Sequence, residues 1–195
     1  MVYYILGKSS SGKDTIYHRL LQDEELKLHE IVGYTTRPIR NGEVDGREYH
    51  FVSIQQMEAM EQEGSIIEKR SYLTEQGVWH YFTAKGKDMD IENKDYLVIG
   101  TLESYKKVRD YFGKQWVKPF YIEVEDGIRL QRALNRERRQ ILPDYKELCR
   151  RFLADSVDFD KEKLQEAGIV QKYENNELEE CIVRMKLEMM EMKNQ

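Results

Sequence analysis

The sequence predicts an α/β fold of three layers, with a mostly parallel central sheet between two layers of helices. Three short apolar runs, at residues 2–6, 96–99 and 117–124, have the composition of strands that are buried on both faces. A helical pattern follows each run, at residues 16–21, at 102–112 and from residue 128 onward. Because strands that alternate with helices build parallel sheets, these three runs are expected to lie side by side.

Length and composition favour a single domain with a substantial core. The chain has 195 residues, of which 40% are hydrophobic and 34% are charged, and this composition fits a soluble, helix-rich α/β protein better than a membrane or a disordered one. No apolar stretch approaches the roughly 20 residues that span a bilayer, and no signal peptide precedes the first run. We therefore expect a cytoplasmic protein without a membrane partner. A net charge of −5 argues against a general nucleic-acid surface.

The two cysteines, Cys149 and Cys181, are far apart and have no partner at a spacing that would bind a metal. Each lies in a helical pattern. We expect both to be reduced thiols.

A glycine-rich turn follows the first apolar run, with the sequence Gly7-Lys-Ser-Ser-Ser-Gly-Lys-Asp-Thr15. Glycines at both ends let the backbone bend so that successive N–H groups face an anion, and the helix that follows points its positive end at the same place. A lysine at residue 13 adds a charge for the β and γ phosphates. The pattern therefore predicts a triphosphate site, formed by Gly7, Ser9, Ser10, Ser11, Gly12, Lys13, Asp14 and Thr15.

The position after Lys13 departs from the phosphate-loop pattern, which has Ser or Thr there, because this chain has Asp14. An aspartate at this point has three readings. Asp14 binds Mg²⁺ directly, or Thr15 does so in its place, or Asp14 only favours the start of a helix.

Residues 31–83 are expected to form a small β-rich lobe, inserted between a helix and a strand of the main sheet. Strands are predicted at 31–32, 49–52, 66–68 and 78–83, with turns at 38, 41–42 and 74–77. A helix is expected to start after Ser53, run to about Glu63 and stop at Gly64.

The remaining residues return to an α/β pattern. Asp126 is expected to cap an arginine-rich helix, which Pro143 interrupts before a second helix at 145–157. A short helix end at 164–168, a strand at 169–173 and a helix at 178–190 complete the prediction.

Two arginines in the inserted lobe, Arg37 and Arg40, lie three residues apart beside a proline that stiffens the turn. Paired guanidinium groups can grip a phosphate, although two solvated arginines are an equally good reading of this pair alone. Side chains suited to reading a base edge or supporting a phosphate follow in the same lobe, namely Glu43, Tyr49, Glu68 and Tyr81. A carboxylate that accepts from an N–H/NH₂ edge selects guanine over adenine.

The stretch Thr35-Thr-Arg-Pro-Ile-Arg-Asn-Gly-Glu43, followed by Gly46-Arg-Glu-Tyr-His-Phe-Val-Ser53, resembles the GMP-binding signature of guanylate kinase. The resemblance covers nearly the whole chain. It implies a P-loop fold with an acceptor-binding lobe and a helical lid. It also implies a GMP site in which Arg37, Arg40, Tyr49 and Tyr81 hold the phosphate, Glu68 accepts from guanine, and Thr83 lies near O6, with Glu43 beside them.

The arginine-rich segment fits the same resemblance, since Arg132, Arg136 and Arg151 align with lid arginines that close over ATP. The implied division of the single domain is a core of residues 1–30, 84–127 and 152–195, a nucleoside-monophosphate lobe of residues 31–83, and a lid of residues 128–151. From composition alone, this basic segment could equally be a solvated face or a weak nucleic-acid contact.

The implied reaction is ATP + GMP ⇌ ADP + GDP with Mg²⁺, in a monomer or homodimer. The charge that develops during phosphoryl transfer would be neutralised by Lys13, Arg37, Arg132, Arg136 and Arg151.

One further departure keeps other acceptors open. Where the family has an Asp-x-Asp pattern after the strand at 96–99, this chain has Ile99 and Thr101. The alternatives are a P-loop kinase for another (deoxy)nucleotide or small phosphorylated acceptor, and a non-catalytic phosphopeptide-binding module. Retention of Gly7, Gly12 and Lys13 argues against the module, since a peptide binder has no use for a triphosphate loop.

Overall fold

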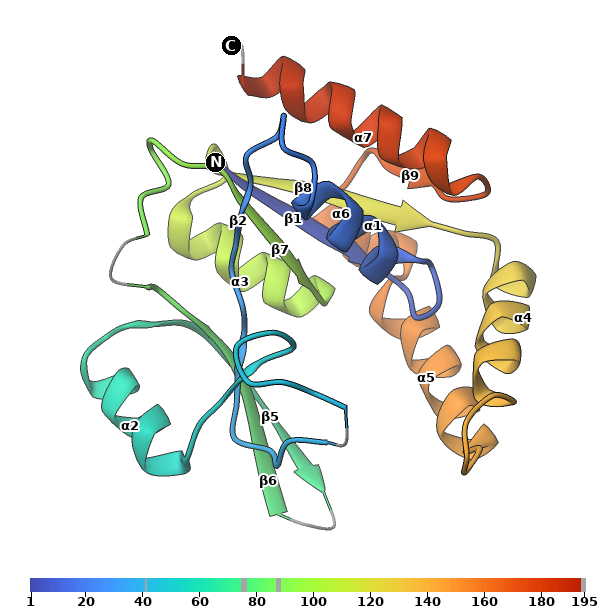
Figure 1. Cartoon of the computed structure of the whole chain (residues 1–195), viewed down its shortest axis with the longest axis horizontal. Helices are drawn as coiled ribbons and strands as arrows, with labels where there is room; N and C mark the ends of the chain where they lie inside the picture. The colour runs from blue at the N-terminus through green and yellow to red at the C-terminus, as the bar shows by residue number, and fades with distance from the viewer. Residues whose placement is uncertain (41, 75–76, 87–88, 194–195) are drawn as a thin grey trace.

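A parallel five-stranded sheet forms the centre of the molecule, seen here in a computed structural model that describes residues 1–40, 42–74, 77–86 and 89–193 (Figure 1). The strand order is β2-β7-β1-β8-β9, and every neighbouring pair is parallel. The strands are β1 (Val2–Gly7), β2 (His29–Glu30), β7 (Tyr96–Gly100), β8 (Val117–Glu123) and β9 (Lys172–Glu174). This arrangement confirms the predicted parallel sheet.

Helices cover both faces of this sheet, because successive side chains of a strand point to opposite faces. Tyr3 and Ile5 of β1 pack on one face with α1 (Lys13–Leu21) and α7 (Leu178–Lys193). Tyr4 and Leu6 pack on the other face with α3 (Leu102–Phe112) and α6 (Lys161–Glu166). The three predicted layers are therefore present.

A second, smaller sheet lies below the first in Figure 1, with the order β4-β3-β6-β5. Its strands are β3 (Tyr34–Thr35), β4 (His50–Phe51), β5 (Ile66–Thr74) and β6 (Gly77–Ala84). Together with α2 (Ile54–Gln62) it encloses a small core of Met57, Phe82 and Ala84. The predicted β-rich lobe is confirmed.

The start and end of α2 follow the prediction. Ser53 accepts a hydrogen bond from the Gln56 backbone, and the Gln56 side chain accepts one from the Ser53 backbone, which completes a capping box. Gly64 has a φ of 70°, the left-handed conformation that ends helices.

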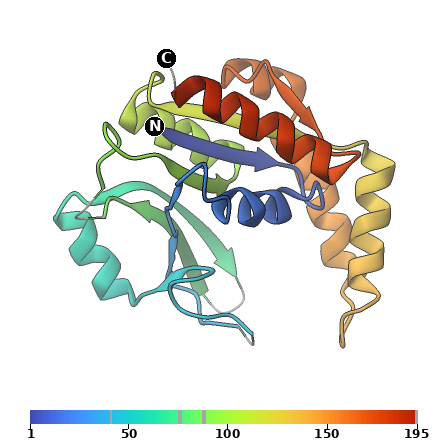
Figure 2. The ribbon, with the colours of Figure 1, turned by 45° about the horizontal axis from the view of Figure 1, so that its top comes forward.

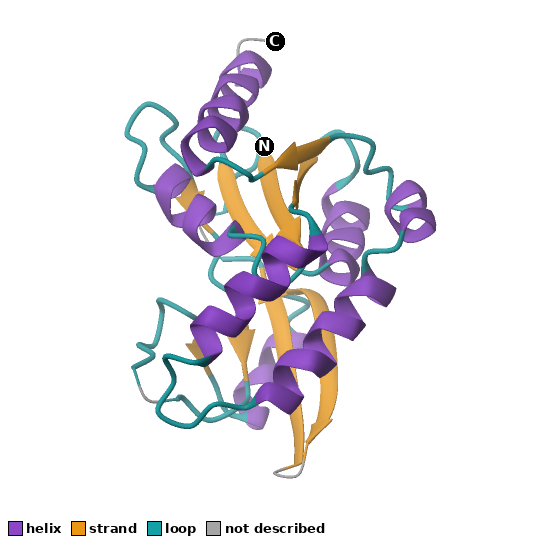
Figure 3. Cartoon of the chain, turned by 90° about the vertical axis from the view of Figure 1, so that its right-hand side faces the viewer, coloured by secondary structure: helices purple, strands orange, loops and turns teal. Residues whose placement is uncertain are grey.

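The arginine-rich segment forms α4 (Asp126–Glu137), and α5 (Tyr145–Asp158) runs back beside it. The two helices project from the end of the main sheet as a pair (Figures 2 and 3). They flank the turn after β1 on the side away from α2.

Three sequence predictions are corrected by the structure. Glu125, not Asp126, caps α4, since its carboxylate accepts from the Ile128 backbone. Residues 31–32 are not a strand, because the chain crosses there from the first sheet to the second. The last strand begins at Lys172 and not at residue 169 as predicted. Ile169 packs in the hydrophobic core on one face of the sheet before the strand starts.

Pro119 lies inside β8, a strand with neighbours on both sides. It is tolerated because β9 pairs with β8 only from Tyr121 onward, so the missing N–H leaves no ladder bond unmade. The predicted turns at 41–42 and 74–77 include residues outside the described part of the chain. Among the described helices, none combines the length and apolarity needed to cross a membrane.

Candidate functional site

The turn between β1 and α1 has the backbone geometry of an anion cradle. Gly12 has a φ of 84°, and Ser10 has a φ of 61°, a conformation that non-glycine residues rarely adopt. A Cβ at Gly7 would lie 2.7 Å from the Ile122 carbonyl oxygen, so a larger residue would push β8 from the turn. Gly7 is therefore required by close packing against β8, and Gly12 is required by its left-handed backbone conformation.

A buried arginine ties this turn to the helical pair. Arg129, with a side chain only 1% exposed, donates from Nε to the Ser9 carbonyl at 3.0 Å. Its other nitrogens donate to Asp126 at 2.5 Å and to Asp155 at 2.8 Å. Asp155 in turn accepts from the Ser9 backbone N–H at 2.8 Å. The turn, α4 and α5 are thus held by a single charged network.

An asparagine after β9 holds the other side of the turn. Asn175 is buried and donates from Nδ2 to the Ser11 carbonyl at 2.7 Å. Arg132 of α4 donates to the Asn175 carbonyl at 3.1 Å. The predicted lid residue Arg132 therefore contacts the loop's support rather than open solvent.

The residues around the predicted metal position begin α1. Lys13 Nζ lies 3.5 Å from a carboxylate oxygen of Asp14, whose side chain is 77% exposed. Thr15 is exposed on the same helix. Among the described residues, no group of three or more His, Cys, Asp or Glu side chains is arranged to hold a metal.

A cavity of about 350 Å³ is lined by the turn after β1, by the pair of helices α4 and α5, and by Arg40 of the inserted lobe. Ser9 and Ser10 line it from the turn, and Arg40 lines it from the second sheet's side. Arg136 and Arg151 line it from α4 and α5. Arg151 donates from Nε to Glu147 at 2.6 Å, which fixes its orientation. Three predicted phosphate-binding arginines therefore meet beside two loop serines.

A larger cavity of about 700 Å³ lies between the two sheets. Ser9, Lys13 and Asp14 line it from the turn and α1, whereas Tyr49 and Thr83 line it from the second sheet. Burial raises the pKa of Tyr49, so this side chain meets the cavity as a neutral phenol. A ligand bound in this cavity would therefore face the loop.

Arg37 is engaged inside the lobe. Its two terminal nitrogens donate to Glu43 at 2.7 and 2.6 Å, and its guanidinium lies over the rings of Tyr49 and Phe51. The hydrogen bonds from Arg37 lower the pKa of Glu43 to about 2. Arg37 is 4% exposed, and its predicted contact with a phosphate stays a prediction.

Tyr81 stands behind Tyr49, with ring centroids 5.6 Å apart in an edge-to-face contact. The aromatic rings of the two tyrosines and the Arg37 guanidinium form one packed group. These contacts hold Tyr49 at the wall of the cavity.

Glu68 lies beneath the wall of the 700 Å³ cavity and is covered by other side chains. Its carboxylate accepts from Thr83 at 3.0 Å and from Ser104 at 2.8 Å. Arg70 donates to both carboxylate oxygens, at 3.1 and 3.2 Å. The side chain of Glu68 is 0% exposed, so Arg70 and not Glu68 faces the cavity.

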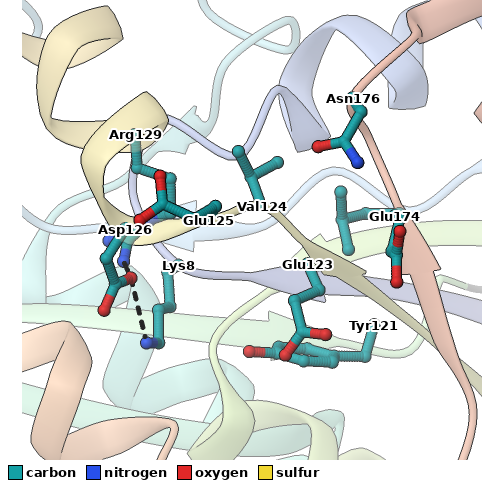
Figure 4. Close-up of a pocket in the computed structure, with 10 residues that line it drawn as sticks. Lys8, Tyr121, Glu123, Val124, Glu125, Asp126, Arg129, Glu174 and Asn176 are labelled. Atoms are coloured by element: carbon teal, nitrogen blue, oxygen red, sulfur yellow. Dashed lines mark hydrogen bonds and ion pairs between the residues drawn. The ribbon is translucent and has the colours of Figure 1, made fainter.

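A third cavity, of about 370 Å³, opens beside the ends of β8 and β9 (Figure 4). Lys8 forms an ion pair with Asp126 in it, at 3.3 Å. The other charged side chains on its wall are Glu123, Glu125, Glu174 and Arg129. Since carboxylates outnumber cations here, this cavity is unsuited to a triphosphate.

Sequence reasoning missed Arg129, Asp155, Asn175 and Arg70. A signal existed for two of them. Arg129 follows Asp126 at the i,i+3 spacing of helical ion pairs, and Arg70 follows Glu68 at the i,i+2 spacing that shares one face of a strand. Asp155 and Asn175 reach the loop only through the tertiary fold.

A glycine-rich turn lies at the carboxyl edge of a parallel sheet, with an inserted lobe across one cavity and a helical pair over another. Comparison with known proteins shows which proteins share this arrangement. The family model for guanylate kinase matches residues 1–77, which include the turn after β1 and the lobe up to β5.

Several curated relatives of the chain are also named guanylate kinase. The chain is 27% identical to a guanylate kinase of Baumannia cicadellinicola over 142 residues, which cover 70% of this chain and 66% of the relative. It is 31% identical to a guanylate kinase of Enterococcus faecalis over 114 residues, covering 56% and 53% respectively. With a guanylate kinase of Zymomonas mobilis it is 40% identical over 68 residues, covering 35% and 31%. The matches thus span from about a third to about two thirds of these relatives.

A solved structure extends the likeness to the whole chain. The crystal structure of guanylate kinase from Anaplasma phagocytophilum matches with a TM-score of 0.67 at 19% identity, covering 100% of this chain and 87% of that one. The predicted P-loop fold and the predicted resemblance to guanylate kinase are confirmed.

Proposed function

We propose that this chain is a nucleoside monophosphate kinase that transfers the γ-phosphoryl group of ATP to GMP. The observation that carries the proposal is the position of Ser9. This loop residue lines both the cavity that faces the second sheet and the cavity that collects Arg40, Arg136 and Arg151. A phosphoryl group held at the loop would therefore have an acceptor site on one side and lid cations on the other.

The proposed donor site is the turn from Gly7 to Lys13, with its N–H groups and the start of α1 directed at the triphosphate. The proposed acceptor site is the 700 Å³ cavity, with Tyr49 toward the phosphate and Thr83 toward the base. Tyr81 would support Tyr49 from behind, and Arg40 would reach the phosphate from the neighbouring 350 Å³ cavity. Residues 31–83 act as the acceptor lobe, residues 128–151 as the lid, and the remainder as the core.

Transfer joins an acceptor phosphate oxygen to Pγ while the bond from Pγ to the β–γ bridging oxygen breaks, so that ADP leaves and GDP forms. Such transfer depends on positioning and on charge stabilisation rather than on proton transfer. We assign the stabilisation to Lys13, Arg136 and Arg151, with Arg132 holding the loop through Asn175. Arg37 contributes by fixing Tyr49, and its direct contact with the phosphate stays a prediction.

The residues present suit Mg²⁺ bound together with ATP. In proteins Mg²⁺ is commonly held by one or two carboxylates plus substrate phosphates, and Asp14 offers an exposed carboxylate next to Lys13. When bound, the ion would neutralise charge on the phosphate oxygens. The proposal includes a metal at Asp14, a monomeric or dimeric state and a cytoplasmic location.

The experiment that tests the proposal is a coupled ADP-release assay with ATP and each of GMP, dGMP, AMP, CMP and UMP. We expect turnover that depends on GMP. No turnover with any acceptor, together with no ATP binding by calorimetry, would rule out the kinase.

Two substitutions at the start of α1 separate the roles of its residues. Lys13→Ala is expected to lower kcat by at least about 100-fold, as loss of a transition-state charge contact does. Asp14→Ala is expected to shift the Mg²⁺ titration of the rate to higher concentration. An unchanged titration would leave Asp14 as a residue that only favours the start of the helix.

A further inference from the structure

The floor of the acceptor cavity is built around a buried ion pair between Glu68 and Arg70 of β5. These residues are two apart in one strand, so their side chains lie on the same face. Thr83 of β6, Thr101 and Ser104 complete the floor, since Thr101 caps α3 and Ser104 lies in its first turn.

The Glu68 carboxylate is already supplied with donors. Oε1 accepts from Thr83, Ser104 and Arg70, and Oε2 accepts from Arg70 Nε. A carboxylate offers about four acceptor positions, so these bonds occupy most of its capacity. Because its side chain is 0% exposed, a base cannot reach it without displacing Arg70.

The Arg70 guanidinium presents its outer end to the cavity. Nε and Nη2 point at Glu68, and Nη1 donates to the Thr101 hydroxyl at 3.2 Å. Among the residues that the structure describes, no acceptor is bonded to the second N–H of either Nη1 or Nη2. The Arg70 side chain is 15% exposed and lines the cavity, so these two donors form the accessible edge.

We propose that Arg70 is the residue that reads the acceptor base, by donating from Nη1 and Nη2 to two adjacent acceptor atoms of a 6-oxopurine, O6 and N7. This inference rests on the proposed function, and it refines the substrate class of that same site. Arginine matches this purine edge with two parallel hydrogen bonds, whereas adenine presents an amino donor beside its N7. Glu68 acts as a positioning residue that fixes the guanidinium.

A consequence follows for the 2-amino group of guanine. The carboxylate that would accept from it is covered by Arg70, so the site does not distinguish a 6-oxopurine with this group from one without it. GMP and inosine monophosphate are therefore expected to be equivalent acceptors, and AMP a poor one.

The experiment measures both kcat/KM and equilibrium binding of GMP, inosine monophosphate, AMP and CMP to the full chain. We expect GMP and inosine monophosphate to agree within about 3-fold, and AMP and CMP to be at least about 10-fold weaker, which is the effect of losing a charge-assisted hydrogen bond. A preference for GMP over inosine monophosphate of 10-fold or more would overturn the inference, because it would mean that Glu68 is uncovered and reads the 2-amino group. Equal use of CMP would overturn it as well.

Substitutions provide the second test. Arg70→Lys keeps a charge beside Glu68 but removes the paired donors, so it is expected to lower kcat/KM for GMP and inosine monophosphate alike by about 10-fold, with little change for AMP. Lys69→Gln is the matched control, since Lys69 lies one residue away and pairs with Glu61 at 2.6 Å. If Arg70→Ala instead strengthened GMP relative to inosine monophosphate, Arg70 would be a cover over Glu68 and not the reader.

Binding data keep this inference separate from the proposed function. Equal binding of GMP and inosine monophosphate without turnover would remove the kinase and retain the role of Arg70. Turnover of GMP with rejection of inosine monophosphate would retain the kinase and remove that role. Absence of binding for all four nucleotides would overturn both.

Discussion

Arg129 is the buried side chain that joins the turn after β1 to helices α4 and α5. It is 1% exposed and is bonded to Ser9, Asp126 and Asp155, while its guanidinium also lies 5.1 Å from the centre of the Phe152 ring. Removing one member of a buried charge network leaves its partners unpaired, which costs more than the network itself contributes. The effect of a substitution should therefore be large.

Arg129→Met is expected to lower the free energy of unfolding by about 3 kcal/mol and to weaken ATP binding, because the Ser9 segment loses its anchor. Urea titration measures the first effect and calorimetry the second. Arg138→Met, at an exposed position at the end of α4, is the control. Equal effects of the two substitutions would show that the buried network contributes nothing.

Gly12 combines a conformational need with a steric one. Its φ of 84° is in the left-handed region, and a Cβ there would lie 2.4 Å from Asn175 Nδ2. Gly168 has a similar φ of 73° with nothing within 4 Å of such a Cβ. A substitution at Gly168 therefore tests backbone strain alone, whereas a substitution at Gly12 tests backbone strain together with a close contact.

We expect Gly168→Ala to destabilise the protein by about 1 kcal/mol, the cost of a left-handed alanine. Gly12→Ala should cost more, because Asn175 must also move and release the Ser11 carbonyl. Thermal unfolding of both variants measures the difference. If both variants were destabilised equally, the contact with Asn175 would contribute nothing to stability.

At the scale of elements, the segment between β3 and β4 is held by the Arg37–Glu43 pair. Glu43 also accepts from the Arg40 backbone at 2.8 Å, so one carboxylate orders the turn that carries both predicted phosphate arginines. The hydrogen bonds from Arg37 lower the pKa of Glu43 from 4.5 to about 2. A lowered carboxyl pKa in the folded state makes this contact sensitive to acid.

The stabilisation by Glu43 is fully present above pH 4.5 and is lost as the pH falls toward about 2. Glu43→Gln is therefore expected to lower stability at pH 7 and to flatten its pH dependence between these limits, as urea titrations at pH 7 and pH 3 can show. Glu58→Gln, exposed on α2, is the control. A Glu43→Gln protein with an unchanged pH dependence would contradict the assignment.

At the scale of the whole molecule, the helical pair and the second sheet flank the loop from two sides (Figure 2). The large cavity between the sheets is lined by residues of both, from Lys13 to Tyr49 and Thr83. The proposed phosphoryl transfer requires exclusion of water from the reacting group, so binding of both proposed substrates should draw the second sheet and the helical pair together.

We expect the radius of gyration from X-ray scattering to fall when a non-hydrolysable ATP analogue and GMP are added together, and to change less with either one alone. One reason is that Arg40 of the inserted lobe lines the same cavity as Arg136 of α4 and Arg151 of α5, so a phosphate bound there would contact both sides. An identical scattering profile with and without both ligands would show that the protein is closed before binding.

Several features follow from local sequence. The alternation of apolar runs and helical patterns determined the parallel sheet, Ser53 and Gly64 marked the limits of α2, and the spacing of Gly7, Gly12 and Lys13 marked the phosphate loop. The physical reason is that strand and helix periods, caps and tight turns depend on residues a few positions apart.

Only the tertiary structure decided which charges are free to meet a ligand. Arg37 and Glu68 were predicted as binding residues from their chemistry, yet one is paired with Glu43 and the other is covered by Arg70. Arg129 and Asp155 acquired their roles through contacts with a loop more than a hundred residues away. Pairing and burial depend on what packs against a side chain, and residues distant in the chain supply those neighbours.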